Sequence, residues 1–288
     1  MKKYTIIAGS SCDISDADLK SPAFDFVTVP LTITINGKDW VDEVGLNIKE
    51  FVAAMKVNKD KPLTACPSPE AFAEKMRAAN ENVIVVTISS KLSGTYNSAC
   101  LAAETVRAEQ PKKKIHVHDS LSATGGECVQ VLRIAELIEN GKFKDFEDLC
   151  KQAEEIRKNH RNRFLLQDPG NMVKTGRMSK VAGIVVRVAN IKIICGDDGQ
   201  GEVKKYATAI GIKKALFALA EFPGELVARG VKPEDNPIIC INHVLNEEEA
   251  LQLKSLVEAK WGFTNIKIRQ QRGLASFYSN DQGIVMGF

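Results

Sequence analysis

Short apolar runs alternate with amphipathic segments along the first half of the chain. Val83–Ile88 is a continuous apolar run rich in β-branched residues, which is typical of a strand buried on both faces of a parallel sheet. It passes through a small polar loop into a helical pattern over Tyr96–Glu109. Tyr4–Ala8 and Ile115–His118 are similar runs, each followed by small polar residues. Strands that alternate with helices in this way predict an α/β domain built on a parallel sheet.

Capping residues predict where two further helices begin. Asn47, with Glu50 three residues later, is a predicted N-cap for a helix over Ile48–Lys56. Ser68 can cap a helix with Pro69 at its first position, running to about residue 79. Three more segments complete the predicted first half: a strand over residues 26–35 interrupted at Pro30, a helix over 126–139 that ends at Gly141, and a charged helix over 145–159.

The second half has the pattern of a separate α/β unit with some antiparallel pairing. Ile191–Cys195 and Glu202–Thr208 are strand-like and flank a glycine-rich turn. We therefore expect two domains: residues 1–160, completed by about 275–288, and residues 161–274. The predicted fold class is a two-domain α/β protein with a parallel first sheet flanked by helices and a mixed second sheet.

Charge and cysteine usage narrow the functional classes. The net charge of +3 is small and its lysines and arginines are scattered, so we expect no nucleic-acid partner. The 7 cysteines are odd in number and form no C-x-x-C pair, which indicates reduced thiols and a cytoplasmic location. The first strand-like run is too short for a secretory signal, and no apolar stretch is long enough to span a bilayer.

Small hydroxyl residues gather in three loops at predicted strand ends. These loops cover Gly9–Cys12, Ser89–Thr95 and Asp119–Gly126, with Thr64–Ser68 as a neighbouring polar segment. Any single Ser or Thr is more often only a helix cap. Together, however, they favour an anion site, because hydroxyls, backbone amides and a helix N-terminus converge at the carboxyl edge of the sheet.

Signatures of common catalytic sites are absent from the sequence. It contains no G-x-x-x-x-G-K-[ST] phosphate loop, no G-x-G-x-x-G after the first strand and no G-x-S-x-G nucleophile elbow. His116 and His118 fall on one face of a strand, but no carboxylate stands at a matching spacing, so no metal site is expected there. We predict neither catalytic residues nor a cofactor.

Several motifs together resemble the DegV family of bacterial lipid-binding proteins. Ser89–Ala99, SSKLSGTYNSA, is similar to the family's S-S-x-L-S-G-T-Y-x-S-A, and Thr64–Pro69 to its T-S-Q-P-S-x. Val117–Ser120 with Gly125 is similar to V-x-D-S/T-x-x-x-S-G, and Lys174–Arg177 to K-G-G-R. The order and spacing of these motifs extend along essentially the whole chain.

The resemblance implies a carrier, and not an enzyme, that holds one long-chain fatty acid such as palmitate. It implies that Thr64 and Ser93 bind the carboxylate, and the Gly94 amide and Ser120 are further candidate head-group residues. A separate fatty acid kinase is the implied partner, for which Arg177 and Lys180 are candidate contacts. Apolar residues that could line an acyl tunnel are Val181, Ile184, Val185, Val188 and Ile191, although ordinary core packing explains each of them equally well.

The sequence departs from the family pattern around the expected head-group site. The first loop has Ala8-Gly9-Ser10 in place of T-D-S, and Cys66 replaces a glutamine. Tyr278 stands where the family has a histidine; a phenol can donate a hydrogen bond to a carboxylate but cannot carry positive charge. Three alternatives therefore stay open: a different lipid, an enzyme acting on a small phosphorylated or carboxylated metabolite, and a structural protein with an empty pocket.

Overall fold

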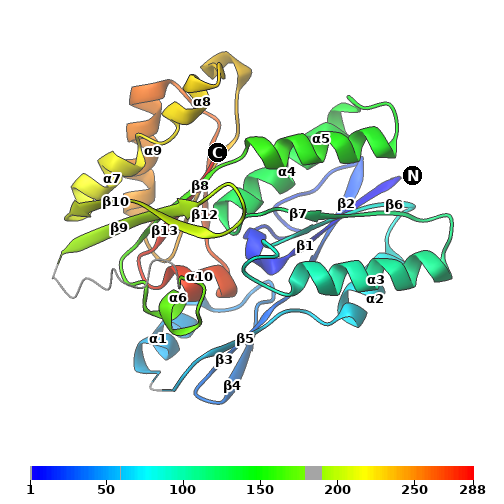
Figure 1. The fold of residues 1–288 in the computed structure, drawn as a ribbon, viewed down its shortest axis with the longest axis horizontal. Helices are drawn as coiled ribbons and strands as arrows, with labels where there is room; N and C mark the ends of the chain where they lie inside the picture. The colour runs from blue at the N-terminus through cyan, green and yellow to red at the C-terminus, as the bar shows by residue number, and fades with distance from the viewer. Residues whose placement is uncertain (1, 59, 179–189) are drawn as a thin grey trace.

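A computed structural model describes residues 2–58, 60–178 and 190–288. The first sheet is entirely parallel and has the strand order β2-β1-β6-β7. Helices cover both of its faces, as predicted for strands with apolar residues on both sides (Figure 1). Its elements are β1 (Tyr4–Gly9), β2 (Phe24–Val29), β6 (Asn82–Thr87), β7 (Lys114–Asp119), α2 (Pro69–Ala78), α3 (Thr95–Glu109), α4 (Gly125–Asn140) and α5 (Phe146–Asn159), with a 3-10 turn at Ser10–Cys12.

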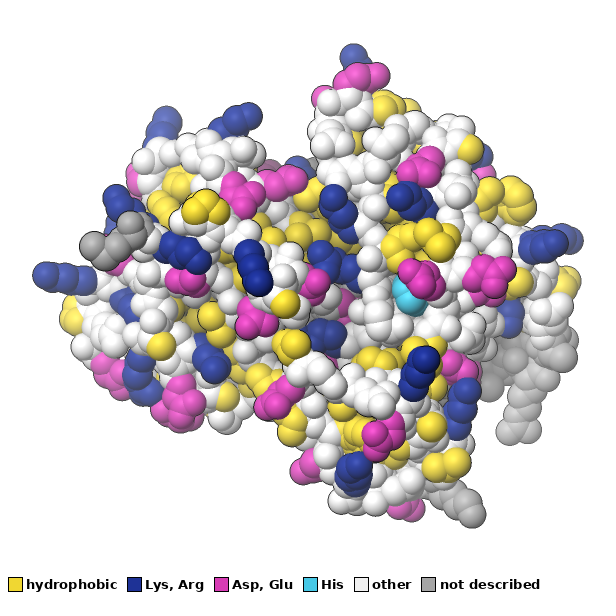
Figure 2. Space-filling model, turned by 180° about the vertical axis from the view of Figure 1, so that it is seen from behind, with side chains coloured by type: hydrophobic (Ala, Val, Ile, Leu, Met, Phe, Trp, Pro, Cys, Tyr) yellow, Lys and Arg dark blue, Asp and Glu magenta, His cyan; other side chains and the backbone are white. Residues whose placement is uncertain are grey.

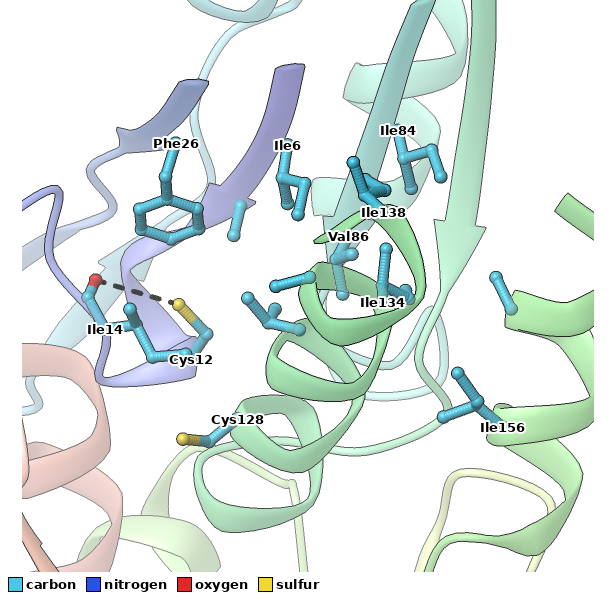
Figure 3. Packing of buried hydrophobic residues seen from close by; sticks show 14 of the residues in the cluster. Ile6, Cys12, Ile14, Phe26, Ile84, Val86, Cys128, Ile134, Ile138 and Ile156 are labelled. Carbon is cyan, nitrogen blue, oxygen red and sulfur yellow. Dashed lines mark hydrogen bonds between the residues drawn. The ribbon is translucent and has the colours of Figure 1, made fainter. Parts of the chain in front are cut away.

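Alternate residues of the first sheet enter two separate cores. Ile6, Ile84 and Val86 point to the face covered by α4 and α5, where they pack with Ile134 and Ile138 (Figure 3). Their neighbours along the strands, such as Ile7 and Val85, pack instead against α2 and α3. This two-sided burial explains the continuous apolar runs in the sequence.

The second sheet is mixed and has the order β10-β9-β8-β13-β11-β12. Only β11 and β12 pair in parallel; the other neighbours are antiparallel. Three helices pack on one face, and the short α6 lies on the other. Its elements are β8 (Asn162–Leu166), α6 (Gly170–Lys174), β9 (Ile191–Asp197), β10 (Val203–Ile210), α7 (Ile212–Leu219), α8 (Gly224–Ala228), β11 (Ile239–His243), α9 (Glu247–Trp261), β12 (Ile266–Gln270) and β13 (Ile284–Gly287), with a 3-10 turn at Pro233–Asp235.

A small third sheet was not predicted. The expected strand over residues 26–35 divides at Pro30, and its two parts join different sheets. The second part pairs in the order β4-β3-β5 and packs against two helices that lie far apart in sequence. The elements of this unit are β3 (Thr32–Ile35), β4 (Lys38–Val41), α1 (Ile48–Val57), β5 (Leu63–Ala65) and α10 (Gly273–Ser279).

The C-terminal segment contributes to two units. Residues 275–288 were expected to complete the first domain. In the structure α10 packs with α1 and β3, whereas β13 pairs with β8 and β11 in the second sheet. An ideal Cβ on Gly287 would lie 2.1 Å from the Gly125 carbonyl oxygen, so this glycine permits close contact between the end of β13 and the start of α4.

Local capping signals are confirmed. The Asn47 side chain accepts a hydrogen bond from the Glu50 amide, and the Ser68 hydroxyl accepts one from the Ala71 amide. Gly141 ends α4 in the left-handed conformation. Within the described ranges, no helix combines the length and the apolar character that crossing a membrane would require.

Candidate functional site

The strand-end loops, β5 and α10 enclose a cavity of about 160 Å³. Thr64 comes from β5, Ser93 and Gly94 precede α3, and Tyr278 lies on α10; all four line the cavity. The Thr64 Oγ1 and Tyr278 OH atoms are 2.9 Å apart and share a hydrogen bond across 214 positions of sequence. The structure therefore brings together four of the five residues predicted for the head-group site.

Ser120, the fifth, is placed elsewhere. Its side chain is fully buried, its hydroxyl donates to the Ser122 carbonyl, and it accepts a hydrogen bond from the Ser122 amide. Ser120 does not line the cavity. The hydroxyl thus closes the loop after β7 on itself, which is the capping role that a small residue in a tight turn commonly has.

The end of the cavity at Ser93 is suited to an anion. Gly94 is the N-cap of α3 and offers no side chain to occupy the helix N-terminus, whose amides carry partial positive charge. The Ser93 and Thr95 hydroxyls share a hydrogen bond of 2.9 Å, which holds Ser93 at the N-terminus of α3. Arg177 also lines the cavity, and its guanidinium lies 6.0 Å from the centre of the Tyr278 ring. Hydroxyls, amides and a cation therefore face the same volume.

A buried carboxyl group lies behind this cavity. Ser11 lines the wall and donates to the Glu127 Oε2 atom at 2.7 Å. Burial raises the pKa of Glu127 well above its ordinary value, and the nearby Asp13 and Asp119 charges act in the same direction, against the opposing hydrogen bond from Ser11. Burial thus favours the protonated form of Glu127, which lowers the negative charge that this wall presents to an anionic ligand.

A second, smaller cavity of about 60 Å³ adjoins the first. Both are lined by Ala123, Thr124 and Tyr278, so they meet at the loop before α4. The far side of the second cavity is mainly apolar and belongs to the second sheet. The side chains there include Phe164, Leu166, Val203 and Val285. The two adjoining cavities therefore place hydroxyl groups on one side of Ala123 and Thr124 and apolar side chains on the other.

Most of the residues expected in an acyl tunnel fall in one segment of the chain, residues 181–188. Val181, Ile184, Val185 and Val188 lie outside the described residues, as does Lys180. Ile191 begins β9 and lines neither cavity.

Other residues that line the first cavity, including Leu31, Met172 and Leu274, were not predicted from the sequence. No local pattern distinguishes these from ordinary core residues, because it is only tertiary packing that turns them toward the cavity.

Comparisons with known proteins agree with this architecture. The family model described as "Uncharacterised protein, DegV family" matches residues 3–280. The chain belongs to the DegV family. A DegV domain-containing protein of Streptococcus pyogenes serotype M1 is 34% identical over 285 residues, covering 99% of each chain.

Two solved structures extend the comparison to three dimensions. The Streptococcus pneumoniae Fatty Acid Kinase (Fak) B3 protein, loaded with linoleic acid, is 33% identical, with a TM-score of 0.90, and the match covers 100% of this chain and 99% of that one. A DegV family protein from Ruminococcus gnavus, refined with vaccenic acid, is 29% identical, with a TM-score of 0.90 and 100% coverage of both chains. This DegV chain thus has the fold of proteins crystallised with fatty acids.

Proposed function

We propose that this DegV chain is a carrier that binds one long-chain fatty acid. The carboxylate lies among Thr64, Ser93, Tyr278 and the Gly94 amide, and the acyl chain extends past Ala123 toward the second sheet. The observation that carries the proposal is the polarity of the two adjoining cavities, with hydroxyls and a helix N-terminus at one end and apolar side chains at the other. A fatty acid has the same polarity along its length.

Burial of a long apolar tail can supply most of the binding free energy, so the residues around the head group need little charge. Each buried methylene contributes roughly 0.8 kcal/mol, so a long acyl chain supplies on the order of 10 kcal/mol before the costs of ordering. The head group then needs orientation more than strong attraction. Neutral hydroxyls such as those of Thr64 and Tyr278 are sufficient for this, which explains how a phenol can stand in place of the family's histidine.

We further infer that the head-group end is presented to a separate fatty acid kinase. A polar groove lined by Lys91 and Asn97 shares Ser93, Gly94 and Arg177 with the cavity. A partner docked in this groove would therefore reach the carboxylate without contact with the tail. On the face of the molecule shown in Figure 2, basic and acidic side chains are interspersed and form no extended patch of one sign.

Native mass spectrometry of freshly purified protein, followed by lipid extraction, tests the carrier function. We expect one fatty acid per chain, and we expect the Thr64→Ala, Ser93→Ala double variant to lose it while keeping its circular dichroism spectrum. Unchanged lipid content in this variant would refute the assignment. A different extracted lipid would replace the fatty acid in the proposal, and protein without ligand that takes up no added fatty acid would reject it.

A reconstituted kinase assay tests the presentation step. Lys91→Ala and Asn97→Ala alter the groove but not the cavity lining, so they should lower the rate of acyl phosphate formation by an added kinase and leave fatty acid affinity unchanged. Acyl phosphate formation by the isolated chain would show that it is an enzyme and would contradict the carrier role.

A further inference from the structure

Three potential metal ligands meet on the far side of the first sheet from α2 and α3. His116 and His118 project from β7, and Glu154 projects from α5. The Glu154 Oε1 atom lies 3.2 Å from His118 Nδ1 and 3.3 Å from His116 Nε2. All three ligand atoms lie within 4.8 Å of one another. The carboxylate that the sequence pattern lacked is thus supplied by a helix that begins 27 positions after the end of β7.

Hydrogen bonds determine which ring nitrogen of His118 carries the proton and which one faces Glu154 as an acceptor. The Gln130 amide nitrogen donates to the Ser120 and Gly126 carbonyls, so Gln130 presents its oxygen to His118. That oxygen lies 2.8 Å from His118 Nε2, which must therefore carry the proton. In the neutral imidazole, Nδ1 then has a free lone pair directed at the Glu154 carboxylate.

The lone pair of His118 Nδ1 and the Glu154 carboxylate oxygen, 3.2 Å apart, repel each other unless a proton or a metal ion lies between them. His116 Nε2 is buried and has no hydrogen-bond partner among the described residues. A metal ion, unlike a proton, can accept lone pairs from all three side chains.

The spacing and surroundings match metal coordination. Two ligands that are each about 2.0–2.1 Å from a tetrahedral zinc ion lie roughly 3.3 Å apart, which agrees with the two distances to Glu154. Gln130 orients His118 from behind, and Arg157 pairs with the other oxygen of Glu154. The side chain of His116 is 25% exposed, so a fourth position can open to solvent.

We propose that His116, His118 and Glu154 form a binding site for one Zn²⁺ ion, with water as the fourth ligand. Two imidazoles and one carboxylate are a donor set that suits zinc. The ion would link β7 to α5. The proposed ligand His118 immediately precedes Asp119 in the sequence. The Asp119 carboxylate accepts hydrogen bonds from the Ser90 and Leu121 amides, in the loops that lead to the ligand cavity.

Zinc titration of the tag-free, metal-stripped full chain tests this site. Competition with a chromophoric chelator should give one Zn²⁺ per chain, and Co²⁺ should give the intense visible absorption of a four-coordinate site. Glu154→Gln and His116→Ala should each weaken zinc binding by at least about tenfold. Because Glu155 is adjacent, exposed and outside the cluster, Glu155→Gln is the matched control and should bind as the wild type does.

Two further controls keep the test decisive. Cys66 is an exposed thiol, so Cys66→Ser must retain zinc binding if the metal lies at the histidine cluster. Zinc should raise the thermal unfolding temperature of the wild type but not that of Glu154→Gln, a variant that keeps the shape of the side chain. Less than one equivalent at saturation, equal affinity in Glu154→Gln, or loss of binding in Cys66→Ser would each overturn the proposal.

Discussion

The phenol oxygen of Tyr278 is the most direct point at which to test the ligand site. Tyr278→Phe removes one atom, leaves the ring in contact with Phe277 at 4.9 Å between centroids, and deletes the hydrogen bond with Thr64. Each hydroxyl has only one proton. When a carboxylate binds, one of the pair donates to the ligand and the other donates to its neighbour, so the two hydroxyls act as a single relay.

The relay sets the loss of fatty acid affinity that is expected when one hydroxyl is removed. A hydrogen bond to a charged group contributes roughly 1.5–3 kcal/mol, and every 1.4 kcal/mol is about tenfold in affinity. Tyr278→Phe and Thr64→Val should therefore each weaken fatty acid binding, and the variant that removes the hydroxyl donating to the carboxylate should do so by roughly 10- to 150-fold. The double variant should lose much less than the product of the two, because the second substitution removes a hydroxyl whose partner is already gone.

Displacement of a fluorescent fatty acid measures these affinities. Tyr4→Phe is the matched control, since Tyr4, the first residue of β1, packs edge-on against Phe143 and does not line the cavity. All variants should keep the wild-type unfolding temperature within a few degrees. Unchanged affinity in Tyr278→Phe, or strictly multiplicative losses in the double variant, would refute the relay.

Four other outcomes follow from the same geometry. Ala123 lines both cavities, so Ala123→Leu should weaken binding of long-chain fatty acids at least about tenfold and spare short-chain ones, as measured by calorimetry. Cys66 is exposed and lines the cavity, so bound fatty acid should slow its labelling by a maleimide. The raised pKa of Glu127 means that the folded state keeps a proton which the unfolded state has lost. The free energy of unfolding should therefore fall as pH rises above the ordinary value of 4.5, and Glu127→Gln should flatten this slope in urea unfolding. Gly287→Ala places a methyl group against the Gly125 carbonyl and should lower the free energy of unfolding by about 1–3 kcal/mol.

For each of these four predictions, one experimental result would contradict it. Equal loss of long and short fatty acids in Ala123→Leu would indicate general damage to the fold. Labelling of Cys66 at the same rate with and without ligand would place the ligand elsewhere. An unchanged pH slope in Glu127→Gln would mean that the carboxyl does not retain its proton on folding, and an unchanged urea midpoint in Gly287→Ala would mean that β13 can move away from α4.

The sequence by itself determined the local elements of this protein. Hydrophobic periodicity and capping act within a few residues, so Asn47, Ser68 and Gly141 marked helix ends correctly. The motif around Ser93 indicated a strand that leads through a hydroxyl loop into a helix, and the structure has β6 and α3 there. Family resemblance added the candidates Thr64 and Tyr278, which no periodic pattern distinguishes.

Only the tertiary structure decided what these elements enclose. It brought Thr64 within hydrogen-bond distance of Tyr278, 214 positions away in the sequence. It also directed the Ser120 hydroxyl to the Ser122 carbonyl of its own loop and placed β13 in the second sheet. It also set Glu154 against His116 and His118. The physical reason is the same in each case: these contacts depend on how whole helices and sheets pack, and packing joins residues whose separation in sequence carries no local signal.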